Sequence, residues 1–208
     1  MAGLDTAWVD TAWVDRAWVG MAVGENLRVR MQPPLLVAVT GPPGAGKTTV
    51  AEGLRARLGL PLVAKDALKE VLGNELGTSG RTESQRLGRA VFEAMALLVR
   101  ELLAANVSLI VEGNFTSRST LFDVLPPARI AQVHVDASPA VLHARLHERD
   151  SHRHPVHYDQ EAADEIRHRA ASGEWRPLDL PGRLIRVDTS EAFPDLDALA
   201  QAVGAPGS

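Results

Sequence analysis

Residues 41–49, GPPGAGKTT, place one ammonium group and two hydroxyls on a backbone that is otherwise nearly free of side chains. Gly41, Gly46, Lys47 and Thr48 occupy the fixed positions of the pattern G-x-x-x-x-G-K-[ST]. Such a loop turns its backbone N–H groups inward to bind an anion, and the helix that follows adds the positive end of its dipole. Lysine then contacts the β- and γ-phosphates, and threonine binds Mg²⁺. We predict an ATP or GTP site here rather than only a tight connection.

The residues predicted to surround this nucleotide are Gly41, Pro42, Pro43, Gly44, Ala45, Gly46, Lys47, Thr48, Thr49 and, from a later helix, Arg145. Lys47 is also predicted to be catalytic, because its charge would follow the phosphoryl group during transfer.

Asp66 follows the apolar run 60–64 at the point where a helix is expected to begin. A carboxylate at this edge of a sheet could accept the proton of an attacking hydroxyl, so we assign Asp66 as the catalytic base and a substrate contact. Aspartate is also a common N-cap, and the two roles can coexist.

Polar residues also occur at and just after the end of the predicted strand 107–113. Glu112 is predicted to hold Mg²⁺ or to contact the substrate, although aspartate is more usual at such a position, and Asn114 is predicted to contact the substrate. Thr116 is expected to cap a helix whose first turn contains Arg118. Arg118 could bind an anionic part of the substrate or lie solvated on the surface.

An arginine-rich stretch runs from Arg145 to Asp159, RLHERDSHRHPVHYD. We predict a mobile lid over about residues 149–160 in which Arg149 and Arg153 stabilise the transferring phosphoryl group, against the alternative of a solvated helix end. Histidines also occur here, and their spacing and the absence of cysteine argue against a metal site: His147, His152, His154 and His157.

These residues need a scaffold, and the alternation of short apolar runs with helical periodicity indicates an α/β fold. The predicted strands are 35–40, 60–64, 107–113, 129–136 and 183–188. Apolar residues recur at helical spacing at Leu68, Val71, Leu72 and Leu76, and again at Leu87, Val91, Met95, Leu98 and Leu102. Ser138 before Pro139 predicts the start of a helix that runs to about Arg149. Nearly all-apolar strands favour a parallel sheet covered on both faces.

The chain has 208 residues, a net charge of −4, no cysteine and no apolar stretch long enough for a membrane span, which favours one soluble cytoplasmic domain and argues against a membrane or nucleic-acid partner. Residues 5–19 repeat a five-residue unit three times. This spacing keeps Trp8, Trp13 and Trp18 on no common face. We predict a disordered extension over 1–31, a domain over 32–204 and a tail over 205–208. Alternatively, the tryptophans dock on a partner or on an apolar patch.

Together, GPPGAGKTT, Lys65-Asp66, VEGNF and the arginine-rich lid resemble the P-loop kinases grouped under the AAA-family ATP-binding label. Their relatives include chloramphenicol phosphotransferase, gluconate kinase, zeta toxins and polynucleotide kinase. The resemblance covers about 35–203 and implies a three-layer fold with five parallel strands in the order 2-3-1-4-5. It also implies phosphate and Mg²⁺ contacts for Lys47 and Thr48, and an adenine site near 186–190.

The function expected from these features is transfer of the γ-phosphoryl group of ATP, with Mg²⁺, to a hydroxyl of a sugar, a nucleoside-like metabolite or an antibiotic, by a monomer or homodimer. Three alternatives remain open: a polynucleotide 5′-hydroxyl kinase, a zeta-toxin-like kinase of nucleotide sugars, and an ATPase or nucleotide switch. With only 4% aromatic residues, the chain has few side chains for stacking nucleic-acid bases.

Overall fold

The computed structural model describes residues 32–116, 119–148, 154–157, 166, 168–170 and 172–205. The predicted extension, 1–31, lies outside these residues. The elements are β1 (Leu35–Thr40), α1 (Lys47–Leu58), β2 (Leu62–Ala64), α2 (Lys65–Leu76), α3 (Arg81–Ala104), β3 (Leu109–Glu112), the 3-10 turn η3 (Thr120–Phe122), β4 (Arg129–Asp136), α4 (Pro139–Glu148), β5 (Arg183–Asp188) and α6 (Leu196–Gly204).

The five strands form one parallel sheet in the order β2-β3-β1-β4-β5. This order and the three-layer arrangement confirm the fold that the resemblance implied. β1 lies in the middle, paired with β3 on one side and β4 on the other, and all six of its residues are buried. A strand covered on both faces needs apolar residues at successive positions, which is why LLVAVT lacks alternation.

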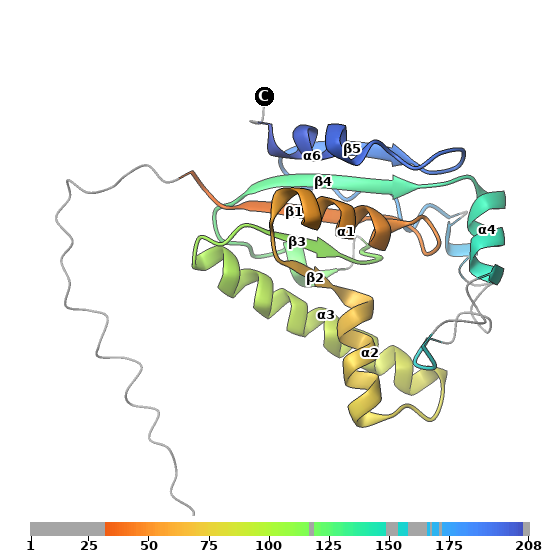
Figure 1. Ribbon diagram of the computed structural model, residues 1–208. Helices are drawn as coiled ribbons and strands as arrows, with labels where there is room; N and C mark the ends of the chain where they lie inside the picture. The colour runs from red at the N-terminus through yellow and green to blue at the C-terminus, as the bar shows by residue number, and fades with distance from the viewer. Residues whose placement is uncertain are drawn as a thin grey trace, which may run out of the picture. The chain divides into compact units, whose positions relative to one another are not determined.

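Two apolar cores, one on each face of the sheet, hold the helices in place (Figure 1). Alternate residues of β1 enter different cores: Val37 packs with α1 and α6, whereas Leu36 packs with α3. Because all the strands are parallel, their carboxyl ends meet at one edge, from which the chain continues into α1, α2 and α4. Among the described residues, this edge therefore carries the predicted site residues Lys47, Thr48, Asp66, Glu112 and Asn114.

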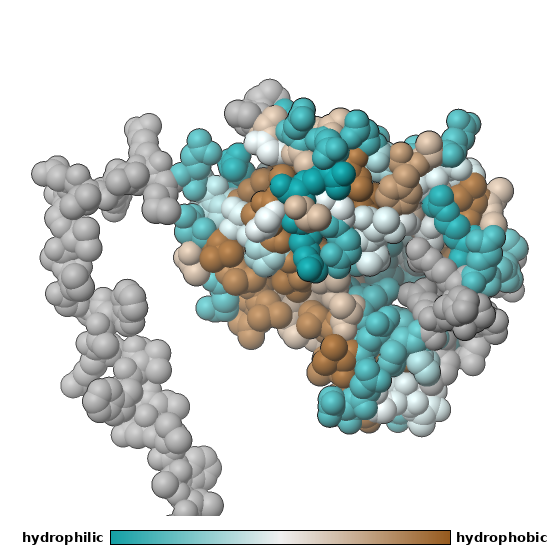
Figure 2. Space-filling model, viewed as in Figure 1, coloured by the Kyte–Doolittle hydropathy of each residue, from teal (hydrophilic) through white to brown (hydrophobic). Residues whose placement is uncertain are grey.

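The spacing of apolar residues correctly predicted where α2 and α3 lie in the chain, but it did not fully predict which side chains of each helix are buried. In α3, Leu87, Val91 and Met95 are buried as predicted, but Leu98 is 43% exposed, and Ala96, Val99 and Leu103 complete the buried stripe instead. In α2, Val71 and Leu76 are exposed, whereas Leu68 and Leu72 pack against the core. Apolar surface is visible over α3 in Figure 2.

The start of α4 is as predicted: Pro139 is its first residue, and Ser138 Oγ accepts a 3.4 Å hydrogen bond from the N–H of Val141. Within the described part of the chain, no helix has both the length and the apolar character that a membrane span requires.

Candidate active site at the carboxyl edge of the sheet

The first glycine of the phosphate-binding pattern is required by packing. Gly41 has a φ of 135°, and a Cβ atom there would lie 1.9 Å from the carbonyl oxygen of Val135 on β4. No side chain can occupy this space, because the oxygen belongs to the backbone of a paired strand. Gly41 thus lets the chain leave β1 close against β4 and turn back into α1.

The second fixed glycine begins α1. Gly46 is the N-cap residue with a left-handed backbone (φ 88°), and no side chain caps the helix. The first-turn N–H groups of a helix have no partners within it, so an uncapped N-terminus suits an anion. Thr48 and Thr49 are exposed in this first turn, where the Thr48 hydroxyl is accessible to a metal ion.

Lys47 lies beside this N-terminus. Its side chain is buried, and Nζ donates a 2.8 Å hydrogen bond to the carbonyl oxygen of Pro42. Pro42 O also accepts from the N–H of Ala45 at 3.3 Å. The ammonium is thus held inside the curve of the loop, where a phosphate oxygen can pair with it. These residues fit the terminal phosphates of a nucleotide.

Arg145, predicted to contact the nucleotide, reaches the loop from α4. Its guanidinium donates to Thr189 Oγ1 at 2.8 Å, to Thr189 O at 2.7 Å and to Gly44 O at 3.4 Å. The Thr189 hydroxyl donates in turn to Ala45 O at 2.9 Å. Arg145 therefore ties α4 and the end of β5 to the loop, and places residues of the predicted adenine region, 186–190, beside it.

Asp66 lies in the first turn of α2, next to the loop's edge of the sheet. The N-cap position belongs to Ala64, so the expectation that Asp66 could cap the helix is wrong. The helix starts at Lys65, two residues earlier than an N-cap at Asp66 would require. The Asp66 carboxylate is partly exposed and accepts a 2.7 Å hydrogen bond from Lys65 Nζ. It keeps access to solvent, as a base must.

Glu112 is buried at the end of β3, paired in register with Val39 of β1 and Ala64 of β2. It therefore stands between the strand that leads into the loop and the strand that leads to Asp66. Asn114 follows, half-buried, and the turn is anchored by the buried ring of Phe115 against Phe92 and Phe122.

The expectation that Thr116 caps a helix is wrong. The helical turn after this loop is η3, its N-cap residue is Ser119, and Thr116 donates its N–H to Ser119 Oγ at 3.0 Å. Serine and threonine both suit such turns, so composition alone did not separate them. Arg118 lies outside the described residues.

Of the predicted lid, residues 154–157 are described, whereas Arg149 and Arg153 lie outside the described part. These four residues lie against α2. His154 Nε2 is 2.9 Å from Asn74 Oδ1, and His157 Nε2 is 3.0 Å from Glu70 Oε1. The Val156 side chain fills the space over Gly73, where a Cβ atom would come within 2.7 Å of it.

The buried Lys69 forms hydrogen bonds that hold residues 154–157 in place. Lys69 Nζ donates to Ser84 Oγ at 2.6 Å and to Val156 O at 3.2 Å, and Ser84 Oγ donates to Val156 O at 2.7 Å. Lys69→Met should keep the apolar stem and lose the charged donor, lowering the free energy of unfolding by ~1–3 kcal/mol.

Urea unfolding followed by circular dichroism measures this change. Arg86→Met is the control, because Arg86 is exposed on α3. Equal urea midpoints for Lys69→Met and the unmodified protein would contradict the stabilising role of Lys69.

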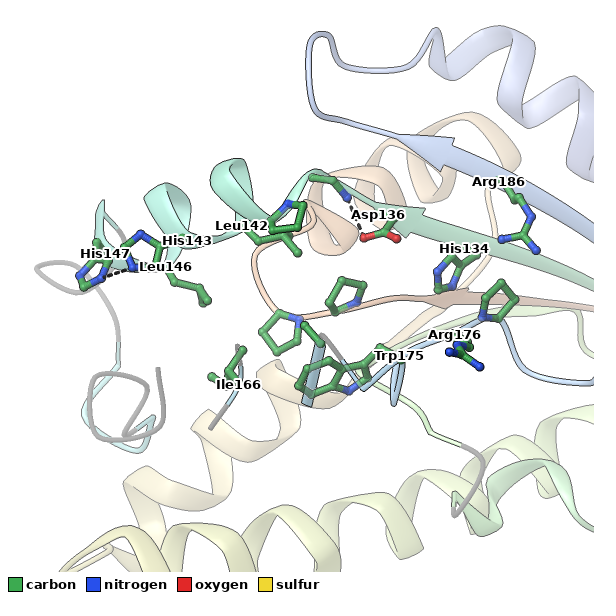
Figure 3. Close-up of a pocket in the computed structure, with 17 residues that line it drawn as sticks. His134, Asp136, Leu142, His143, Leu146, His147, Ile166, Trp175, Arg176 and Arg186 are labelled. Atoms are coloured by element: carbon green, nitrogen blue, oxygen red, sulfur yellow. Dashed lines mark hydrogen bonds between the residues drawn. The ribbon is translucent and has the colours of Figure 1, made fainter. Parts of the chain in front are cut away.

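A cavity of about 390 Å³ lies on the Pro42–Pro43 side of the loop (Figure 3). Figure 3 shows its walls coming from the end of β4, from α4 and from the segment around Trp175. Its apolar lining residues include Pro42, Pro43, Ala137, Pro139, Leu142, Leu146, Ile166, Ala170, Trp175 and Pro177. The polar lining residues include His134, Asp136, His143, His147, Arg176 and Arg186. The sequence analysis missed this cavity.

His134 is the buried polar residue of the cavity wall among the described residues. Burial lowers the pKa of its imidazole, and the positive charges of Arg186 and Lys47 lower it further, whereas Asp136 opposes the shift. The ring is therefore neutral near pH 7. Pro42 and Pro43 place the cavity beside the loop that holds Lys47.

A pair of histidines on α4 also escaped the sequence analysis. His143 and His147 are four residues apart, and their Nε2 atoms are 3.1 Å apart. In the sequence, His147 was considered only with the histidines that follow it. The i, i+4 spacing of His143 and His147 could have revealed the pair, because it places both side chains on one helix face. Within the described ranges, no group of three or more potential metal ligands occurs.

The parallel sheet, the glycine-lined loop and the lysine at the start of α1 define a P-loop nucleotide-binding protein of the α/β class. The sequence model of the AAA domain family (AAA_33) matches residues 36–172, which is most of the chain, and the protein belongs to this family. No protein with a curated function matches the sequence significantly.

Solved structures agree with this assignment. One from Chloroflexus aurantiacus J-10-fl, named "a putative kinase", is 35% identical, has a TM-score of 0.75, and the alignment covers 83% of this chain and 97% of that one. A sugar kinase from Janibacter sp. HTCC2649 (21% identity, TM-score 0.56, 84% and 100% coverage) shares the fold. So does a gluconokinase from Sinorhizobium meliloti 1021 (21% identity, TM-score 0.52, 82% and 91% coverage). The neighbours support a kinase.

Proposed function

We propose that the protein transfers the γ-phosphoryl group of ATP to a hydroxyl group of a small molecule, with Mg²⁺ as the metal ion. The observation that carries this proposal is the arrangement at one edge of the sheet. Lys47 and the uncapped start of α1 suit the phosphates, and two carboxylates, Asp66 and Glu112, follow the neighbouring strands β2 and β3. A nucleotide switch would need no base beside its phosphates.

Each residue then has a defined role. Lys47 and the backbone N–H groups of the loop bind the β- and γ-phosphates, and the Thr48 hydroxyl binds Mg²⁺. Glu112, at the end of β3, would help to hold the metal ion. The adenine lies on the side of the loop where Arg145 and Thr189 meet.

The transfer step requires a proton acceptor and a stabilised leaving group. The acceptor hydroxyl loses its proton to Asp66 as its oxygen forms a bond to the γ-phosphorus, and the bond from that phosphorus to the bridging oxygen of ADP breaks. Mg²⁺, when bound, neutralises charge on the leaving diphosphate. Lys47 follows the charge on the transferring group.

A coupled assay tests the proposal by measuring ADP release from Mg-ATP in the presence of pooled hydroxyl compounds. We expect release that depends on an added compound. Equal release with and without any compound would identify an ATPase instead. Release that depends on a 5′-hydroxyl oligonucleotide but on no small molecule would favour a polynucleotide kinase.

A further inference from the structure

The cavity and the Arg145 contacts involve different residues of the same loop and of the same helix. Arg145 binds Thr189 and Gly44, whereas Leu142 and Leu146, from the same helix, line the cavity with Pro42 and Pro43. If the base of the nucleotide lies by Arg145, the cavity is left for another molecule. Its border with Pro42 and Pro43 places that molecule beside the loop.

The hydrogen bonds around His134 fix what its ring offers to the cavity. Gln132 satisfies both ends of its amide when its nitrogen donates to Leu178 O at 2.9 Å and its oxygen accepts from Leu178 N–H at 2.8 Å and from Thr40 Oγ1 at 3.1 Å. The Thr40 hydroxyl has one proton, which this bond uses. The 3.1 Å contact between Thr40 Oγ1 and His134 Nδ1 must therefore be donated by the ring.

A neutral ring that carries its proton on Nδ1 has a lone pair on Nε2. This Nε2 has no hydrogen-bond partner among the described residues. Protein atoms do not enclose it completely, and His134 lines the cavity, so a bound molecule can reach this nitrogen. The buried wall thus offers an acceptor and needs a donor.

Besides charged side chains such as Asp136, Arg176 and Arg186, the lining contains several apolar side chains that suit an apolar molecule. Leu142, Leu146, Ile166 and Trp175 present hydrocarbon and an indole ring, and Figure 3 shows them between the His134 end and the His143–His147 end of the cavity. Hydroxyls of a polyol placed against these four side chains would lose water without gaining hydrogen bonds, which costs free energy for each of them. A flat apolar molecule has few hydrogen bonds to water to lose when it binds.

We propose that this cavity binds the body of the phosphoryl acceptor and selects an alcohol with an apolar, ring-containing body, one polar group of which donates a hydrogen bond to His134 Nε2. The statement that the ligand accepts the phosphoryl group rests on the proposed kinase function. Binding of the ligand in the cavity does not depend on that function. Sugar acids such as gluconate are then poor ligands.

The test uses the full-length protein with 2-(indol-3-yl)ethanol as the probe, in saturating Mg-ADP, followed by ligand-observed saturation-transfer NMR. For a ligand of this size we expect a Kd of ~1 mM or tighter. D-gluconate should give no saturation transfer under the same conditions. Binding of gluconate but not of the probe would overturn the proposed selectivity. Binding of the probe in the absence of Mg-ADP but not in its presence would show instead that the cavity is a nucleotide-base site.

Paired substitutions test the location and the hydrogen bond. Ala170→Phe fills the cavity from a half-buried position and should abolish probe binding, whereas Ala104→Phe, at an exposed position at the far end of α3, should leave it unchanged. His134→Asn can still donate to Thr40 but lacks an atom in place of Nε2, so binding should weaken ~10-fold. His134→Gln can place its amide oxygen there and should recover part of the loss.

The outcomes separate this proposal from the kinase proposal. Probe binding that is sensitive to Ala170→Phe, in a protein that turns over no acceptor, would support the cavity and contradict the kinase. Normal binding in Ala170→Phe, or equal binding in His134→Asn and the unmodified protein, would overturn the cavity or the hydrogen bond, respectively.

Discussion

Replacing Lys47 by alanine should lower acceptor-dependent turnover at least ~100-fold and weaken Mg-ATP binding, while the protein remains folded. The Lys47 ammonium is buried within the loop at the first residue of α1, and alanine would remove this positive charge from the phosphate site. The fold should survive because Pro42 O retains the N–H of Ala45 as a partner at 3.3 Å. Calorimetric titration with Mg-ATP and the coupled ADP assay measure the two effects.

Arg55→Ala is the control for this substitution, because Arg55 is on the same helix and its 3.2 Å ion pair with Glu52 is exposed. An exposed pair contributes ~0–1 kcal/mol, so turnover should not change. Wild-type ATP affinity and turnover in Lys47→Ala would show that the loop does not hold phosphates, and the proposed function would fail with it.

The sequence was most informative where a local pattern determines structure. The run LLVAVT can be buried on both faces only as a central strand, and β1 is that strand over the predicted residues. Ser138-Pro139 marks a helix start through the backbone geometry of proline, and α4 begins there. The glycines at 41 and 46 were recognised from their spacing alone.

The sequence was less informative where neighbours distant in the chain decide. The capping role considered for Asp66 depends on where α2 starts, and pairing of Ala64 with Glu112 extends β2 directly into the helix. The exposure of Leu98 depends on how α3 turns against the sheet. The spacing of apolar residues shows that a helix has an apolar face, but it does not determine which of the neighbouring residues at the edge of that face are buried.

His134 is the clearest case of a site residue that local patterns could not identify. It occupies one position in a strand whose prediction rested on apolar character, and a histidine there carries no motif. Its importance comes from Gln132 on the same strand and from Thr40 and Leu178, which lie far from it in the sequence, and together these residues determine which nitrogen carries the proton. Similarly, the cavity combines residues between Pro42 and Arg186 and exists only in the folded chain.

Asp66→Asn should lower kcat by ~10²- to 10⁴-fold and leave ATP affinity unchanged, if Asp66 accepts the proton of the attacking hydroxyl. Asparagine has the same shape but cannot take up that proton at neutral pH. The structure makes this substitution a clean test, because Asp66 is not the N-cap of α2 and its ion pair with Lys65 is partly exposed. Loss of such a pair costs ~0–1 kcal/mol, so the change in stability should be small.

Steady-state kinetics with the acceptor found in the screen separates a role in proton transfer from a structural one. A catalytic base affects kcat, whereas a misplaced helix would raise KM for both substrates and lower Tm. Glu75→Gln makes the same chemical change at an exposed position of α2 and should behave as the unmodified protein. If Asp66→Asn retains kcat within a few-fold, the hydroxyl must lose its proton elsewhere, and the buried Glu112 at the adjacent strand end becomes the carboxylate to substitute next.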